Sequence, residues 1–172
     1  MTQPVITTER LTLRRPEPDD LELWTEFFLS PRGEYIRGEA TPGLAWRAFA
    51  TILGHWQIHG YGLFVITDTA SGKTLGAAGP WNPGDWPEPE TGWTIWDPAA
   101  EGQGIAYEAS LATRRYIYTE LRWPRIVSYI AFENKRSAAL AERLGCVLDQ
   151  SAAHPPGKPC FVYRHPGPEA VL

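Results

Sequence analysis

The sequence predicts a single α+β domain in which helices cover a sheet, and three observations lead to this fold class. Segments with the two-residue period of strands and segments with the 3.6-residue period of helices follow one another in the order βααβββαβαββ. No internal repeat or linker divides the 172 residues, and this length is typical of one domain. We therefore expect one domain over residues 1–172, with its core at about 7–165 and a short tail at 166–172.

The first third of the chain predicts one strand and two helices. Residues 5–15 alternate apolar and polar side chains, which is typical of a half-buried strand, and the prolines that follow end it. Residues 21–28 and 43–59 place their apolar side chains at helical spacing, so each predicts a helix with one buried face. Gly60 stands where a glycine commonly ends a helix.

The middle of the chain predicts three strands. Residues 62–67 and 74–80 are short apolar runs joined by the polar residues 68–73, which favours an antiparallel hairpin. Residues 81–89 contain three prolines and are expected to form a rigid aromatic loop, because proline removes a hydrogen-bond donor and fixes φ. Residues 91–96 then predict a strand that stops at an Asp-Pro pair.

The last third predicts two helices and three strands. A long helix is expected over residues 105–121 and a strand over 125–132. A helix over 135–144 ends at a glycine, and two short strands at 147–148 and 160–164 complete the sheet.

Composition and charge exclude several classes of protein. Lys and Arg number 16 against 20 Asp and Glu, so the net charge is −4 and bulk binding of nucleic acid is not expected. No apolar run approaches the ~20 residues that cross a bilayer, and the first residues lack the pattern of a secretory signal. Cys146, Cys160 and the four histidines lack metal-ligand spacing. We therefore expect no metal, no membrane contact and a cytoplasmic location.

The segment from Trp96 to Ala109 carries the clearest chemical signal, because it predicts a strand, a turn with Gly102 and Gly104, and a helix. A glycine-rich turn at a helix N-terminus presents unpaired N–H groups and the positive end of the helix dipole, which together favour a phosphate. The alternative is a plain glycine turn that starts a helix. A dinucleotide-binding fingerprint is disfavoured because Tyr107 takes the third glycine position, and the Gly-Lys-Ser/Thr of a P-loop is absent.

The order of elements and three short motifs together resemble the GNAT acetyltransferase family. The motifs are Glu101-Gly102-Gln103-Gly104-Ile105-Ala106, Asn134-Lys135-Arg136-Ser137 and Leu144-Gly145-Cys146. Residues 8–14 and 59–62 are similar to the branch of ribosomal-protein N-terminal alanine acetyltransferases. The resemblance covers residue 7 to about residue 165.

This resemblance implies a central, mostly antiparallel mixed sheet flanked by helices, and an acetyl-CoA-dependent N-acetyltransferase. It implies that the acetyl group passes to a primary amine, either a protein N-terminus or a small amine, by direct attack within a ternary complex. A homodimer is one possible oligomeric state. Backbone N–H groups of the turn would hold the pyrophosphate of acetyl-CoA, although the family pattern has Arg or Gln where this chain has Glu101. The cofactor-binding residues so implied are Ile95, Trp96, Glu101, Gly102, Gln103, Gly104, Ile105, Ala106, Asn134 and Ser137.

Two residues are predicted to take part in the chemistry. Glu90 resembles an acid of this branch and is our candidate for the base that takes the proton of the amine, directly or through water. The alternative is a solvated glutamate at the start of a strand. Ser137 matches the family's helix residue near the leaving thiol, whereas the tyrosine acid of many members is missing, because no Tyr occurs from 130 to 162. The rival function from another class is a CoA-binding module without turnover.

Charge and aromatic residues are distributed unevenly around these motifs. Residues 74–113 contain no Lys or Arg and have a net charge of −6, whereas residues 114–143 have a net charge of +4. An anionic cofactor would favour the basic half and a cationic amine the acidic half, unless these are ordinary solvated faces. Four tryptophans are expected near the acceptor side, either to hold an ammonium group or to pack: Trp81, Trp86, Trp93 and Trp96.

Overall fold

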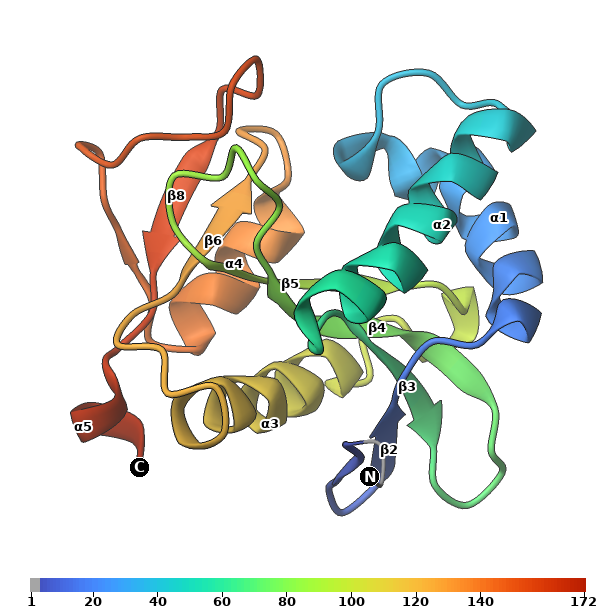
Figure 1. Ribbon diagram of the computed structural model, residues 1–172, viewed down its shortest axis with the longest axis horizontal. Coiled ribbons are helices and arrows are strands. Elements are labelled where there is room, and N and C mark those ends of the chain that lie inside the picture. Colours follow the sequence, from blue (N-terminus) through green and yellow to red (C-terminus); the bar gives the residue numbers. More distant parts are fainter. Residues whose placement is uncertain (1–3) are drawn as a thin grey trace.

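A mixed sheet forms the centre of the structure, a computed structural model that describes residues 4–172. Within that range its strands follow the spatial order β1-β2-β3-β4-β5-β6-β8-β7 (Figure 1). All neighbouring strands are antiparallel except β5 and β6, so the predicted α+β class and mostly antiparallel mixed sheet are confirmed. The strands are β1 Ile6–Thr7, β2 Leu11–Arg14, β3 Phe64–Asp68, β4 Thr74–Trp81, β5 Glu90–Ile95, β6 Val127–Ile130, β7 Val147–Leu148 and β8 Phe161–Arg164.

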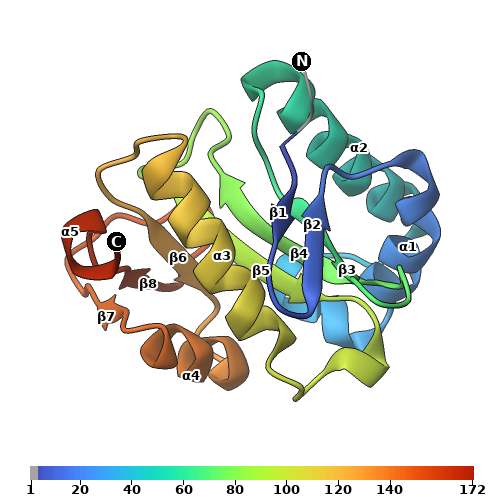
Figure 2. The ribbon, with the colours of Figure 1, turned by 90° about the horizontal axis from the view of Figure 1, so that it is seen from below.

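Different helices bury the two faces of the sheet. On one face, Val65 and Trp96 pack against α1 and α2. On the other face, Ile66 and Ala78 pack against α3, which Figure 2 shows running across the sheet. The helices are α1 Leu21–Leu29, α2 Pro42–His59, α3 Ile105–Thr119, α4 Lys135–Arg143 and α5 Pro168–Val171, and a 3-10 helix, η2, covers Pro31–Ile36.

Local sequence explains where the helices begin and end. The Thr41 side chain accepts a hydrogen bond from the Leu44 N–H at the start of α2, and Pro42 occupies the first turn, where its missing N–H costs nothing. Gly60 ends α2 with φ 75°, as predicted, because only glycine adopts this left-handed conformation without strain. The predicted ends of the other elements differ from the observed ones by a residue or two.

The first predicted strand is wrong in one respect, because residues 5–15 form a hairpin of two strands. Ile6 pairs with Leu13, and the chain reverses between them. At this turn the Thr8 hydroxyl accepts a hydrogen bond from the Leu11 N–H. The Glu108 carboxylate of α3 accepts bonds from the Thr8 hydroxyl and from the Arg10 N–H, so a distant helix fixes the turn. The tail at 166–172 also contains a short helix, α5.

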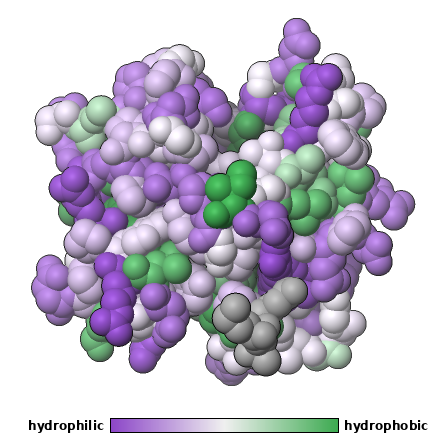
Figure 3. Space-filling view, viewed as in Figure 1, coloured by the Kyte–Doolittle hydropathy of each residue, from purple (hydrophilic) through white to green (hydrophobic). Residues whose placement is uncertain are grey.

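Exposed apolar side chains are scattered over the surface. Figure 3 shows a mostly hydrophilic face with small, separate apolar patches. Trp46 and Ile58 are two of the exposed apolar residues, and both lie on α2. Single apolar residues are common on protein surfaces, so this face does not by itself indicate a partner, and the homodimer stays a prediction.

Strand β4 contains an extra residue in its pairing with β3, and next to it a glycine that β5 approaches closely. Ile66 pairs with Gly76 whereas Thr67 pairs with Thr74, so Leu75 is an extra residue in β4. A Cβ atom on Gly76 would lie 2.2 Å from the Thr94 carbonyl oxygen of β5. The close approach of β4 and β5 therefore requires glycine at this position.

We expect Gly76→Ala to lower the free energy of unfolding by about 1–3 kcal/mol, because the added methyl group must push the β4 and β5 backbones apart. Gly54→Ala is the matched control, since a Cβ there meets nothing within 4 Å and lies inside α2. That change should raise stability by up to ~1 kcal/mol. Urea denaturation of both variants measures the difference, and equal effects would contradict the close approach of β4 and β5 at Gly76.

Candidate functional site

The candidate site lies where β5 and β6 part. Among the described residues these strands have one paired position, Glu90 with Val127, where the Val127 N–H donates to the Pro89 carbonyl at 3.1 Å. Next to it, the Ser128 hydroxyl donates to the Thr91 carbonyl at 2.6 Å in place of a backbone donor. The regular ladder between the two strands therefore stops almost as soon as it begins.

This early stop leaves backbone groups of β5 without a strand partner. Alternate residues of a strand direct their backbone groups to opposite edges, so Thr91, Trp93 and Ile95 direct their N–H and C=O groups toward β6. Pro89 has no N–H and directs its carbonyl the same way. Buried backbone groups need hydrogen-bond partners. An extended ligand that contains amide groups can supply them, as a peptide does when it adds to a sheet edge.

The turn after β5 has the geometry that the phosphate prediction requires. Gly102 and Gly104 have φ values of 72° and 76°, and α3 begins at the next residue, Ile105. The first N–H groups of a helix have no partner inside it, and they carry the positive end of the helix dipole. The structure thus brings Gly102, Gly104, Ile105 and Ala106 together as predicted, while phosphate binding itself stays a prediction.

Glu101, the residue that departs from the family pattern, lies between two arginines. Its carboxylate accepts hydrogen bonds from Arg32 Nε at 2.7 Å and from Arg136 Nη1 at 2.9 Å. Burial disfavours the charged form, but the bonds from Arg32 and Arg136 outweigh it and hold the pKa of Glu101 below its usual value. Arg10 also reaches the turn, where its Nη1 donates to the Gln103 carbonyl at 3.1 Å.

Ile95, the last residue of β5, and Trp96, which follows it, were predicted to bind cofactor and lie near this turn. Both carbonyl groups accept hydrogen bonds from the Arg32 guanidinium, at 2.6 Å for Ile95 and 2.8 Å for Trp96. The Trp96 ring is buried against α1 and α2, and its indole N–H donates to the Thr94 hydroxyl. These two residues can therefore offer a ligand mainly backbone groups. The N–H of Ile95 faces the edge of β5 that β6 leaves unpaired.

Glu90 is the first residue of β5, at the point where the strands part. Its carboxylate accepts a hydrogen bond from the Trp86 indole N–H at 2.6 Å. Burial raises the pKa of Glu90 to about 7, although the Trp86 bond, the Tyr129 N–H and the charge of Lys158 favour the ionised form. A carboxyl group that titrates near neutrality suits a general base. Glu90 is half-buried, which favours this role over a fully solvated surface glutamate, and the role stays a prediction.

Ser137 and Asn134 lie at the start of α4. Asn134 Oδ1 accepts a hydrogen bond from the Ser137 N–H at 3.1 Å and so caps the helix. The neighbouring Ala138 packs with Ala106 of α3 and Trp93 of β5 in one apolar cluster. Arg136 in the first turn of α4 also reaches Glu101, in the turn before α3. The role of Ser137 near a thiol stays a prediction.

The predicted separation into an acidic and a basic half is largely cancelled by ion pairs. Four of the six acids between residues 74 and 113 pair with Lys or Arg, and most of these partners come from outside both halves. Of the four tryptophans, Trp86 contacts Glu90, whereas Trp81 stacks on His55 with ring centroids 4.4 Å apart. Trp93 and Trp96 pack on opposite faces of the sheet.

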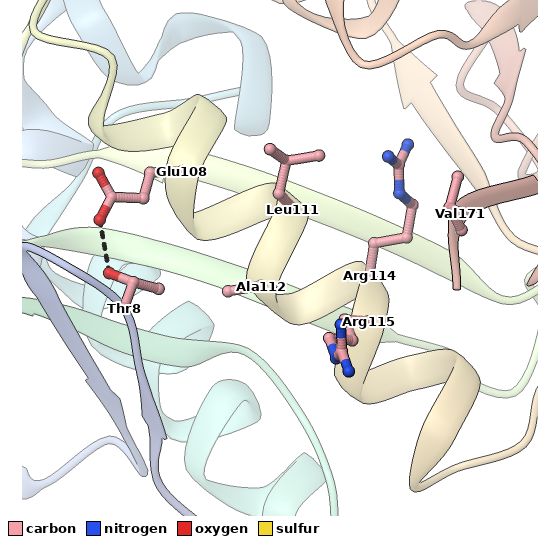
Figure 4. A pocket seen from close by; sticks show the side chains of 7 residues that line it. All are labelled: Thr8, Glu108, Leu111, Ala112, Arg114, Arg115 and Val171. Carbon is pink, nitrogen blue, oxygen red and sulfur yellow. Dashed lines mark hydrogen bonds between the residues drawn. The ribbon is translucent and has the colours of Figure 1, made fainter.

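Two surface cavities lie away from the open edge of β5. One of about 360 Å³ is lined by residues of α3, by Thr8 and by Val171 (Figure 4). The other, of about 260 Å³, lies between α1, α2 and Arg37. Over residues 4–172, no three His, Cys, Asp or Glu side chains are placed to hold a metal ion. No helix in that range is long and apolar enough to cross a membrane.

Sequence reasoning missed several residues that shape this site. Arg32 and Arg10 reach the glycine turn from segments about 70 and 90 positions earlier in the chain. Arg10 falls inside residues 8–14, but nothing local marks the contact of either arginine with the turn. Tyr129 of β6 was not singled out, and Trp86, which was expected near the acceptor side, bonds to the Glu90 carboxylate instead of only packing. Arg136 falls inside a quoted motif, but only the fold pairs it with Glu101.

Comparison with known proteins gives a consistent result. The family model of the acetyltransferase (GNAT) domain matches residues 10–147. An acetyltransferase from Agrobacterium tumefaciens is 34% identical, with 96% of each chain covered and a TM-score of 0.88. A ribosomal-protein-S5-alanine acetyltransferase from Vibrio fischeri shares the fold at 19% identity, with 94% of each chain covered and a TM-score of 0.66. A ribosomal L7/L12 α-N-protein acetyltransferase in complex with coenzyme A shares it at 16% identity, covering 94% of this chain and 96% of that one, with a TM-score of 0.68.

The raised pKa of Glu90 predicts how stability changes with pH. The folded state holds this proton more tightly than the unfolded state, so Glu90 makes the free energy of unfolding fall as pH rises from about 4.5 to about 7. Glu90→Gln should therefore be more stable than wild type above pH 7, by roughly 1–3 kcal/mol, and nearly equal to it below pH 5.

Glu88→Gln is the matched control. Hydrogen bonds from Arg164 lower the pKa of Glu88, so this variant should lose stability above pH 5. Denaturation curves at pH 5 and pH 8 distinguish the two variants. A Glu90→Gln protein that is less stable than wild type at pH 8 would contradict a folded-state pKa of about 7 for Glu90.

Proposed function

The chain belongs to the GNAT acetyltransferase family and is an N-acetyltransferase, and on this premise we propose that it acetylates a primary amine by direct attack on acetyl-CoA in a ternary complex. The observation that supports this most is the Glu90 carboxyl group, which has a pKa of about 7 and lies where β5 and β6 part. The two ribosomal-protein acetyltransferases show that the fold is shared, and the substrates in their names are not assigned to this chain.

The residues present fit acetyl-CoA at three places. The N–H groups from Gly102 to Ala106 would hold the pyrophosphate, and the open edge of β5 at Trp93 would bind the amides of the pantetheine arm. Asn134 holds the first turn of α4, and Ser137 on that turn would donate a hydrogen bond to the departing sulfur. When bound, acetyl-CoA supplies an acetyl group activated as a thioester.

Glu90 would take up the proton that the amine loses. The amine nitrogen forms a bond to the acetyl carbon, the carbon–sulfur bond breaks, and the thiolate of CoA takes up a proton. An α-amino group with a pKa near ~8 is about 10% neutral at pH 7, whereas a lysine near ~10.4 needs about 4.6 kcal/mol to lose its proton. A base with the pKa of Glu90 suits the α-amine, so we favour a protein N-terminus or a small amine of similar pKa.

Direct transfer is favoured over a covalent acetyl-enzyme. Cys160 lies near Glu90, but burial and the Glu90 charge both raise the pKa of its thiol. Burial raises the pKa of Cys146 to about 12. A thiol needs its thiolate form to act as a nucleophile, so neither cysteine is suited to carry the acetyl group.

A CoA-binding module without turnover is the second candidate. Glu101 replaces the usual Arg or Gln of the turn, and no tyrosine occurs from residue 130 to 162 to protonate the thiolate. Release of free thiol from acetyl-CoA, measured with a panel of small amines and N-terminal peptides, separates the two candidates. Tight binding of CoA without release for any acceptor would favour the module.

Gly104→Val should weaken the binding of CoA by about tenfold or more. The branched side chain would strain the backbone at φ 76° and move the first N–H groups of α3 away from the phosphate. Gly72→Val is the matched control, because its φ is 73° and it lies in the distant β3–β4 loop. Calorimetric titration with CoA measures both variants, and equal losses of affinity would refute the phosphate site.

Glu90→Gln should lower kcat/KM for the amine by roughly 100-fold near neutral pH, within the usual range for loss of a general base. The affinity for CoA should stay nearly unchanged, because Glu90 lies at the other end of β5 from the turn. The loss should shrink between about pH 8 and 9 for an α-amine, which solvent then deprotonates. Unaltered kcat/KM over this pH range would show that another group takes the proton.

A further inference from the structure

Each of the three guanidinium nitrogens of Arg32 donates one hydrogen bond, and these bonds connect η2 with the end of β5 and with the glycine turn. Its Nε donates to Glu101, its Nη1 to the Trp96 carbonyl and its Nη2 to the Ile95 carbonyl, at 2.7, 2.8 and 2.6 Å. The group also lies 5.4 Å from the centre of the Phe27 ring of α1. Arg32 itself belongs to η2, the 3-10 helix between α1 and α2.

The second arginine on Glu101 is held much less firmly. The side chain of Arg136 is 72% exposed, whereas those of Arg32 and Glu101 are 25% and 27% exposed. Exposed ion pairs contribute little, because water screens them and a mobile side chain loses entropy. The position of Glu101, the first residue of the glycine turn, therefore depends mainly on Arg32.

The helix that carries Arg32 also reaches the loop that follows β6. Tyr35 and Ile36 are exposed apolar residues of η2. The Tyr35 hydroxyl approaches the Glu133 carbonyl, in the loop between β6 and α4, at 3.5 Å. Thus η2 contacts both sides of the place where β5 and β6 part.

We propose that Arg32 is a positioning residue that ties the glycine turn and the end of β5 to η2. It acts through Glu101 and the two carbonyl groups, and it holds the N–H groups at the start of α3 in place for the phosphates of the CoA thioester. This inference rests on the proposed function. It also assigns a role to Glu101, because the carboxylate at this position accepts the hydrogen bond from Arg32 that fixes the turn.

Arg37 supplies a close control from the same segment. Its guanidinium donates to the Phe28 and Ser30 carbonyls at 2.6 and 3.0 Å and lies 5.9 Å from the centre of the Phe28 ring. It therefore braces η2 against α1 much as Arg32 does, but none of its bonds reaches β5 or the turn. A purely structural role of Arg32 predicts that the two arginines behave alike.

The experiment measures CoA affinity by calorimetry and acetyl transfer by thiol release in Arg32→Met and Arg37→Met. We expect Arg32→Met to weaken CoA binding about tenfold or more, as loss of charged hydrogen bonds would, with kcat at saturating acetyl-CoA changed by less than about threefold. Arg37→Met should change the CoA affinity by less than about twofold. Equal losses of affinity in the two variants would overturn the proposal.

A double-mutant cycle with Glu101→Gln tests the connection itself, and this milder variant keeps the test open if Arg32→Met folds poorly. The affinity lost in the double variant should be at least about threefold smaller than the product of the two single losses, because both changes break one contact. Losses that multiply, or a Glu101→Gln protein with wild-type CoA affinity, would overturn the proposal. If the wild-type protein binds CoA and the variants give either of these results, only the inference about Arg32 fails. If the wild-type protein does not bind CoA, the proposed function fails as well.

Discussion

The early end of the β5–β6 ladder is the constraint on which the rest of the site depends. A strand in the middle of a sheet normally has partners for its backbone groups on both edges, and leaving them without partners is costly. Three side chains replace the missing partners here. The Ser128 hydroxyl bonds to the Thr91 carbonyl, the Glu90 carboxylate takes the Tyr129 N–H, and Arg32 bonds to the Ile95 carbonyl. The backbone N–H and C=O of Trp93 lie between them on the same edge, and the proposed pantetheine contact would use these two groups.

Two glutamates close together in the chain show how the surroundings set the chemistry of a carboxyl group. Arg164 donates to the Glu88 carboxylate from Nη1 and Nη2, each at 2.9 Å, and this lowers the pKa of Glu88. Glu90 has no such ion pair, and burial raises its pKa to about 7. The first residue holds the loop to β8, and the second is available to accept a proton near neutral pH. A near-neutral base reduces the stability of the fold above pH 7, as functional groups often do.

The acids around the glycine turn do not form a negative field, because basic residues from other elements neutralise them. Glu101 is held by Arg32 and Arg136, and Glu108 by Arg10. These pairs place several arginines around the start of α3, beside its unpaired N–H groups. Phosphate groups are favoured at such a position although the whole chain is acidic.

Short-range patterns in the sequence determined most of the fold and part of the site. The order of elements, the glycine turn before α3, the cap at Asn134 and Glu90 at the start of a strand follow from periodicity, turn chemistry and motifs within a few residues. The hairpin at residues 6–14 was missed because Glu108, about 100 positions later, holds its turn. Arg32 was missed because nothing local marks a contact with Glu101, and the place where β5 and β6 part depends on pairing between distant strands. The pKa of Glu90 depends on burial. Burial and long-range pairing exist only once the chain has folded, so only the tertiary structure could decide them.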